Sequence, residues 1–133
     1  MNNNLVIIID DDSINNKICS IYIKKTGISE NIKCFLNGDE GIKYLISDFN
    51  PENFSNVLLF LDLNMPVMNG WEFLEEYDKL SESYKQKISL FILSSSIDER
   101  DIAKASDNIY VIDFISKPFT PNILSSIKEK HVK

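Results

Sequence analysis

The sequence predicts an α/β protein in which helices cover both faces of a five-stranded parallel sheet. The apolar runs at residues 5–9 and 58–61 have the length and composition of strands that are buried on both sides, as in parallel sheets. Strand segments alternate strictly with helical segments along 133 residues. Such alternation joins parallel strands through right-handed crossovers, so we expect one doubly wound domain over residues 1–133.

The first strand and the first helix meet at a cluster of acidic residues. The strand ends at Asp10, Asp11 and Asp12, and a helix is expected over residues 13–25. Asp12 or Ser13 can cap the start of this helix. Helical spacing predicts an apolar stripe that faces the core, and its members are Ile14, Ile18, Ile21 and Tyr22.

Alternation over residues 32–36 predicts a second strand at an edge of the sheet, with Ile32, Cys34 and Leu36 on one side. The helix expected over residues 39–47 contains Gly41, which costs about 0.5–1 kcal/mol relative to alanine. It is therefore not a strong helix by itself.

The buried strand at residues 58–61 ends abruptly in Asp62. Pro66 and the Asn69-Gly70 pair then turn the backbone out of the sheet. A helix follows, and its apolar side is predicted to consist of Trp71, Phe73, Leu74, Tyr77 and Leu80.

The last third of the chain repeats the pattern. It is predicted to contain a polar connection over 81–86, a strand over 88–93, a helix over about 97–105, a strand over 109–114 and a final helix after Thr120. Ser96 and Glu99 have capping-box spacing, and Pro121 suits the first position of a helix. The helix over 97–105 has few apolar anchors.

Composition limits the classes of function. The net charge of −6, from 14 basic and 20 acidic side chains, argues against nucleic acid or an anionic membrane as the main partner. No apolar stretch could span a bilayer and no signal peptide is evident, so we expect a cytoplasmic protein. Cys19 and Cys34 lack metal-binding or redox spacing and are interpreted as reduced core residues. The only histidine, His131, lies near the end, which argues against histidine-based catalysis.

Polar side chains follow four of the predicted strands, at the edge where open α/β sheets bind ligands. They are Asp10 and Asp11 after the first strand, Asp62 after the third, Ser94 after the fourth and Lys117 after the fifth. Each one alone also fits a structural role as a helix cap, a turn residue or a solvated lysine. Their coincidence at successive strand ends favours one shared site.

The chemistry of this set points to phosphoryl transfer. Carboxylates within about 4 Å of one another repel by several kcal/mol at an effective dielectric near 20, so the site needs a cation. Oxygen ligands without imidazole or thiolate favour Mg²⁺ or Mn²⁺. A lysine and a serine add donors for the oxygens of a transferring phosphoryl group, and a carboxylate can be its nucleophile.

The combined pattern resembles the receiver domain of two-component response regulators. The resemblance covers essentially the whole chain and lies in Asp10-Asp11, Asp62-Leu63-Asn64-Met65-Pro66 with Gly70, Ser94, and Lys117-Pro118. It implies a flavodoxin-like sheet with strand order 2-1-3-4-5. It also implies that Asp62 accepts a phosphoryl group from a phosphohistidine on a partner kinase.

The same resemblance implies a role for each site residue. Asp11 and Asp62 would bind Mg²⁺ directly, Asn64 would do so through its backbone carbonyl, and Asp10 would act largely through water. Lys117 would pair with the phosphate. Ser94, in place of the more usual threonine, would move to meet the phosphate, and Phe114 would follow as an aromatic switch.

Such a domain signals by changing conformation and binding proteins, and it catalyses only its own phosphorylation and dephosphorylation. Its implied partners are a sensor histidine kinase or a histidine phosphotransfer protein, together with an unidentified downstream protein. A monomer or a phosphorylation-dependent dimer is expected. The chain starts at Met1 and ends soon after the last helix, so we expect a stand-alone regulator; the alternative is a receiver from a hybrid kinase.

Two other classes of protein share parts of this pattern. A flavodoxin that binds flavin mononucleotide needs a Ser/Thr/Gly-rich loop after the first strand, and three aspartates there would repel the phosphate. A phosphatase with an aspartate nucleophile usually carries a second acid two residues later, where this chain has Asn64.

Overall fold

The computed structural model describes residues 3–95, 98–117 and 120–132 of the chain. The strands are β1 (Asn4–Ile9), β2 (Asn31–Phe35), β3 (Asn56–Leu61), β4 (Ile88–Ser94) and β5 (Val111–Ser116). The helices are α1 (Ser13–Thr26), α2 (Gly38–Ser47), the short 3-10 helix η1 (Pro51–Asn53), α3 (Gly70–Asp78), α4 (Glu82–Lys87), α5 (Glu99–Asp107) and α6 (Pro121–His131). All strand pairs are parallel, in the order β2-β1-β3-β4-β5. The predicted fold class and strand order are confirmed.

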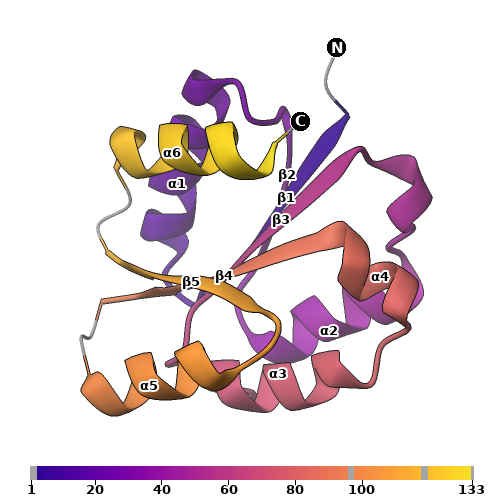
Figure 1. The fold of residues 1–133 in the computed structure, drawn as a ribbon, viewed down its shortest axis with the longest axis vertical. Helices are drawn as coiled ribbons and strands as arrows, with labels where there is room; N and C mark the ends of the chain where they lie inside the picture. Colours follow the sequence, from indigo (N-terminus) through magenta and orange to yellow (C-terminus); the bar gives the residue numbers. More distant parts are fainter. Residues whose placement is uncertain (1–2, 96–97, 118–119, 133) are drawn as a thin grey trace.

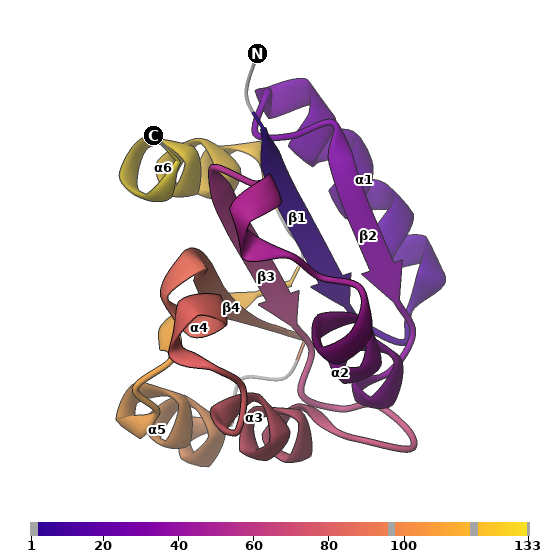
Figure 2. The same ribbon diagram turned by 90° about the vertical axis from the view of Figure 1, so that its right-hand side faces the viewer.

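Helices lie on both faces of the sheet, with α1 and α6 on one face and α2, α3 and α5 on the other (Figures 1 and 2). β1 shows why both faces need cover. Its residues alternate between two cores, with Leu5, Ile7 and Ile9 in the larger and Val6 and Ile8 in the smaller. Every residue of this strand is buried, as the apolar run predicted.

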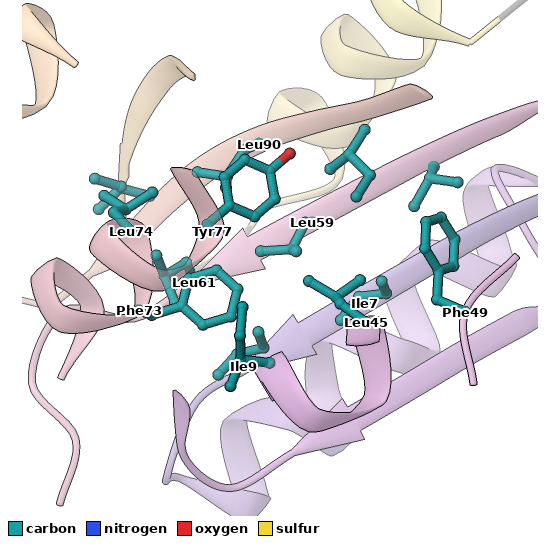
Figure 3. Packing of buried hydrophobic residues seen from close by; sticks show 14 of the residues in the cluster. Ile7, Ile9, Leu45, Phe49, Leu59, Leu61, Phe73, Leu74, Tyr77 and Leu90 are labelled. Carbon is teal, nitrogen blue, oxygen red and sulfur yellow. The ribbon is translucent and has the colours of Figure 1, made fainter. Parts of the chain in front are cut away.

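The larger core fills the space between the sheet and the helices α2 and α3. Phe73 and Tyr77 of α3 are packed against strand residues such as Leu61, while Leu45 comes from α2 (Figure 3). In α2, a Cβ at Gly41 would lie 2.5 Å from the Cδ1 of Ile9. Gly41 therefore lowers helix propensity but allows α2 to approach β1 closely.

The predicted core face of α1 is wrong for three of its four residues; the fourth, Tyr22, is half-buried against the smaller core. Ile14, Ile18 and Ile21 are 71%, 44% and 47% exposed. The buried residues of α1 are instead Asn16, Cys19 and Ile23, which also have helical spacing. Helix α1 carries apolar residues on two faces, and the face with Cys19 and Ile23 is the one that packs on the sheet.

Two segments of the second half also differ from expectation. The predicted polar connection over 81–86 contains the short helix α4. Strand β5 begins at Val111, two residues later than predicted, and Ile109 is 86% exposed in the turn before it.

A register shift opposite Leu90 and Phe91 leaves Ile112 as an extra residue in β5. This bulge brings Val111 and Phe114 to the same core, whereas strict alternation would have placed them on opposite faces.

Smaller corrections concern β2 and the start of α5. Leu36 and Cys34 are exposed, so only Cys19 of the two cysteines is a core residue. Helix α5 is capped by Asp98, whose side chain accepts from the backbone N–H of Arg100. The predicted capping-box residue Ser96 lies outside the described residues, as do Ile97 and Pro118. None of the described helices has the length and apolar composition that crossing a membrane requires.

Candidate functional site

The carboxyl ends of the central strands converge on one site, and backbone hydrogen bonds hold them in register there. The N–H of Asp62 donates to the carbonyl of Ile9 at 2.9 Å, which ties the end of β3 to the end of β1. The N–H of Lys117 donates to the carbonyl of Ser94 at 2.8 Å, which ties β5 to β4. The sheet itself thus positions the acidic residues and the lysine.

Three carboxylates meet at this edge. Asp10, Asp11 and Asp62 each offer one oxygen, and these oxygens all lie within 4.8 Å of one another. Asp10 and Asp62 are buried, whereas Asp11 is exposed. A set of oxygen ligands with this spacing can hold a hard divalent cation.

Lys117 is the cation that the fold itself supplies. Its Nζ lies 2.6 Å from Oδ2 of Asp10 and 3.9 Å from Oδ1 of Asp62. Burial lowers the pKa of Lys117, but its hydrogen bond to Asp10 and the charges of Asp10 and Asp62 outweigh that effect, so its pKa is raised. Lys117 therefore stays protonated and neutralises part of the acidic cluster.

Asp10 is held by several donors at once. Its Oδ1 accepts from the backbone N–H of Asp12 at 3.0 Å, and its Oδ2 accepts from Nδ2 of Asn15 at 3.0 Å. Nδ2 of Asn16 donates to the backbone carbonyl of Asp10 at 2.9 Å. Neither asparagine was predicted from the sequence as a site residue. They follow the aspartates at the start of α1, but nothing in their type or spacing distinguishes them from surface amides.

Asp12 has a structural role. Its side chain accepts from the N–H groups of Ile14 and Asn15 and so caps α1. Of the two predicted cap residues, Asp12 is thus the one used.

The carboxylate of Asp62 is under electrostatic strain. Burial and then the charge of Asp10 raise its pKa from 3.8 to about 6. Lys117 and a hydrogen bond from the backbone N–H of Asn64 act in the opposite direction, and Asp11 adds a smaller upward effect. A metal ion beside Asp62 would relieve this strain.

The loop after β3 keeps its backbone close to Asp62. A Cβ at Gly70 would lie 2.7 Å from the backbone oxygen of Asp62, so only glycine fits at this position. The N–H of Met68 donates to the carbonyl of Pro66 at 2.7 Å, and Val67 between them has φ of 69°. This tight γ-turn lies in the left-handed region that a β-branched residue rarely adopts. The side chain of Asn64 is exposed, and the use of its carbonyl as a metal ligand stays a prediction.

The predicted switch pair, Ser94 and Phe114, lies at and near the ends of neighbouring strands. Ser94 is 1% exposed at the last position of β4. Phe114 pairs in register with Ile92 and is half-buried against the core between the sheet and α5. The geometry places both residues close to the acidic edge, while their role as a switch stays a prediction.

Comparison with known proteins indicates one family. The family model for the response regulator receiver domain matches residues 6–128. A two component response regulator from Cytophaga hutchinsonii is 31% identical, with a TM-score of 0.83 over 98% of this chain and 97% of that one. A response regulator receiver protein from Dyadobacter fermentans is 29% identical, with a TM-score of 0.83 over 95% and 96% of the two chains. The Mn²⁺-bound form of response regulator Rcp1 shares the fold at 19% identity, with a TM-score of 0.74 over 95% and 92%.

The curated relatives are longer proteins. A protein-glutamate methylesterase/protein-glutamine glutaminase of Clostridium acetobutylicum is 29% identical over 96% of this chain, which spans 34% of that protein. The histidine kinase CKI1 of Arabidopsis thaliana is 23% identical over 94% of this chain, which spans 12% of that protein.

Proposed function

This chain belongs to the family of response regulator receiver domains, and from that premise we propose that Asp62 accepts a phosphoryl group from a phosphohistidine of a partner protein. A receiver domain is a phosphoacceptor signalling module, so family membership sets aside the flavodoxin and phosphatase alternatives. The observation that carries the proposal is the convergence of three carboxylates and Lys117 at one edge of the sheet.

The difference between the two buried carboxylates supports Asp62 as the acceptor. Asp10 is engaged by a backbone N–H, an asparagine amide and a lysine at hydrogen-bonding distance. Asp62 accepts from the backbone N–H of Asn64 and has Lys117 only at 3.9 Å, so it has fewer donors than Asp10 and keeps more of its carboxylate available. A pKa of about 6 leaves Asp62 ionised at neutral pH, as a nucleophile must be.

The transfer forms one bond and breaks one. A carboxylate oxygen of Asp62 bonds to phosphorus while the bond between phosphorus and the imidazole nitrogen of the donor breaks. The electron pair of the broken bond stays with the imidazole, so the transfer needs no oxidant or reductant.

Asp11, Asp62 and the backbone carbonyl of Asn64 would hold Mg²⁺, or Mn²⁺, with Asp10 acting through water. The set fits such an ion because its donors are all oxygens and because two of its carboxylates are buried beside each other. When bound, the ion supplies positive charge to the oxygens of the transferring group. The Rcp1 structure was obtained in a Mn²⁺-bound form, which supports a divalent cation in proteins of this fold.

Three residues would respond to phosphorylation of Asp62, namely Lys117, Ser94 and Phe114. Lys117 is within 4 Å of both buried carboxylates, so its ammonium can pair with the new phosphoryl group at little displacement. The hydroxyl of Ser94 would bind the same group, and Phe114 would then move within the space beside α5. Phosphorylation would shift an existing equilibrium between conformations rather than build a new fold.

The exposed stripe of α1 suggests where the phosphodonor docks. Ile14, Ile18 and Ile21 form one apolar row on the helix, and Ile14 lies in its first turn, close to Asp11. A helix of a sensor histidine kinase or a histidine phosphotransfer protein could cover this row while it presents its histidine to Asp62. The net charge of −6 makes a direct nucleic-acid partner unfavourable, so the output is proposed to be protein binding.

A small phosphodonor tests the acceptor without a partner protein. Incubation with acetyl phosphate and Mg²⁺ should add the mass of one phosphoryl group to the intact chain. Asp62→Asn or an excess of chelator should abolish the addition, because the nucleophile or the cation is then missing. Asp113→Asn is the matched control, since Asp113 is exposed on β5 and should leave labelling unchanged. Equal labelling of Asp62→Asn and the parent would refute the assignment.

The extent of the natural protein is a separate question. A stand-alone regulator over residues 1–133, located in the cytoplasm, stays a prediction. Because the curated relatives are longer proteins, the alternative is that this chain is a receiver domain within a larger protein. The full reading frame around this sequence decides between the two.

A further inference from the structure

A groove of about 430 Å³ lies between α3 and α5, next to the turn that leads into β5. Both views show α5 beside α3 (Figures 1 and 2). The groove is lined by the end of α3, the end of α5 and residues 108–110. It is therefore near the amino-terminal end of β5, whereas the acidic site is at the carboxyl ends of the strands.

The α5 side of the groove is polar. Helix α5 contributes Lys104 and Asp107 to the lining. The neighbouring walls are apolar, with Leu74 buried, Trp71 half-buried and Ile109 86% exposed. Ile109 and the apolar wall beside it thus leave apolar surface in contact with water, and a bound partner could cover this surface.

The rim of the groove is acidic. Glu75, Asp78 and Asp107 line it, and Lys104 is the one positive residue of the lining. Lys85 also donates to the backbone carbonyl of Asp78 at 2.8 Å, but its ammonium is paired with Glu82 outside the groove at 3.1 Å. The Nζ of Lys104 lies 4.5 Å from the centre of the Trp71 ring, so the groove already holds a cation against its aromatic wall. The three carboxylates outnumber the ammonium of Lys104, so the rim favours positive charge in the occupant.

We propose that this groove binds a basic segment of a partner protein, one that carries a large aliphatic side chain flanked by lysine or arginine. The aliphatic group would pack on Trp71, Leu74 and Ile109, and the basic groups would pair with the acidic rim. A second copy of this chain is a poor occupant, because each copy carries a net charge of −6 and the same acidic rim.

Trp71 is the only tryptophan of the chain, so its fluorescence reports on the groove directly. The probe is an amphipathic peptide of lysine and leucine, titrated into the whole protein. One control peptide has glutamate in place of lysine, and another has glycine in place of leucine. Only the first peptide should give a saturable change in fluorescence. Equal binding of the glycine peptide would mean general attraction to an acidic protein and would overturn the proposal.

Matched variants locate the binding site. Ile109→Ser and Glu75→Lys change exposed groove residues, and each should weaken binding of a labelled peptide roughly tenfold. Ile46→Ser and Glu30→Lys make the same changes at exposed positions outside the groove and should keep the affinity within about twofold. Equal losses in the two sets would place the peptide elsewhere and refute the proposal.

Two further measurements distinguish peptide binding in the groove from self-association and from phosphorylation at the acidic site. Sedimentation of the parent and of Ile109→Ser should give the same mass; a dimer that Ile109→Ser dissociates would make a second copy the occupant and overturn the proposal. Labelling by acetyl phosphate should be unchanged in Glu75→Lys. Loss of peptide binding and loss of phosphorylation are thus independent outcomes.

Discussion

Asp62→Asn should stabilise the metal-free protein at neutral and alkaline pH. The folded protein raises the pKa of Asp62 from 3.8 to about 6, first through burial and then through the charge of Asp10. At about 1.4 kcal/mol for each pH unit, the ionised carboxylate costs the folded state about 3 kcal/mol at pH 8. This value is an upper bound for the stability that Asp62→Asn gains, because relaxation of the folded structure near Lys117 relieves part of the strain.

The direction of the pKa shift of Asp62 sets the pH range in which Asp62→Asn should stabilise the protein. A carboxyl group whose pKa is raised on folding costs stability above its folded pKa and costs nothing below its unfolded pKa. The gain from Asp62→Asn should therefore be full above about pH 6, decline as the pH falls toward 4, and vanish below it. Urea unfolding in chelator from pH 4 to 8 measures this, with Glu30→Gln as the exposed control. A gain that is independent of pH, or a loss at pH 8, would refute the reasoning.

Three other outcomes are expected. Mg²⁺ should raise the urea midpoint of the parent but have much less effect on Asp11→Asn, because a ligand stabilises only a state that binds it. An equal rise of the urea midpoint in both proteins would show that Asp11 does not bind the metal. Gly70→Ala should destabilise by about 1–3 kcal/mol, since the new Cβ would meet the backbone of Asp62 at 2.7 Å, and urea unfolding that matches the parent would contradict that contact. A thiol reagent should modify exposed Cys34 in the native protein while Cys19 reacts only after unfolding, because burial raises its pKa to about 12; peptide mapping of the labelled protein distinguishes the two.

The sequence by itself determined the fold class and brought the site residues to one edge. Both are local properties of the chain. Strand β3 is a continuous apolar run that ends in Asp62, and parallel strands place their carboxyl ends at the same edge whatever the details of packing. The meeting of Asp62 with Asp10 and Lys117 could therefore be predicted before any contact was known.

Only the tertiary structure decided which face of α1 is buried. The helix carries apolar residues on two faces, and periodicity alone does not choose between them. The choice depends on how the crossover from β1 lays the helix on the sheet. That arrangement buries Cys19 and Ile23, directs Asn16 to the carbonyl of Asp10, and leaves Ile14 and Ile18 in solvent.

The tertiary structure also decided the path of β5 and the state of the site. The bulge at Ile112 depends on pairing with β4, a partner distant in sequence, and it places Phe114 on the side of α5. The pKa of Asp62 depends on burial and on charges that three different strands bring together. Residue types and spacing name the members of such a site, but their distances and burial set its energy, because electrostatic interactions depend on the surroundings of each charge.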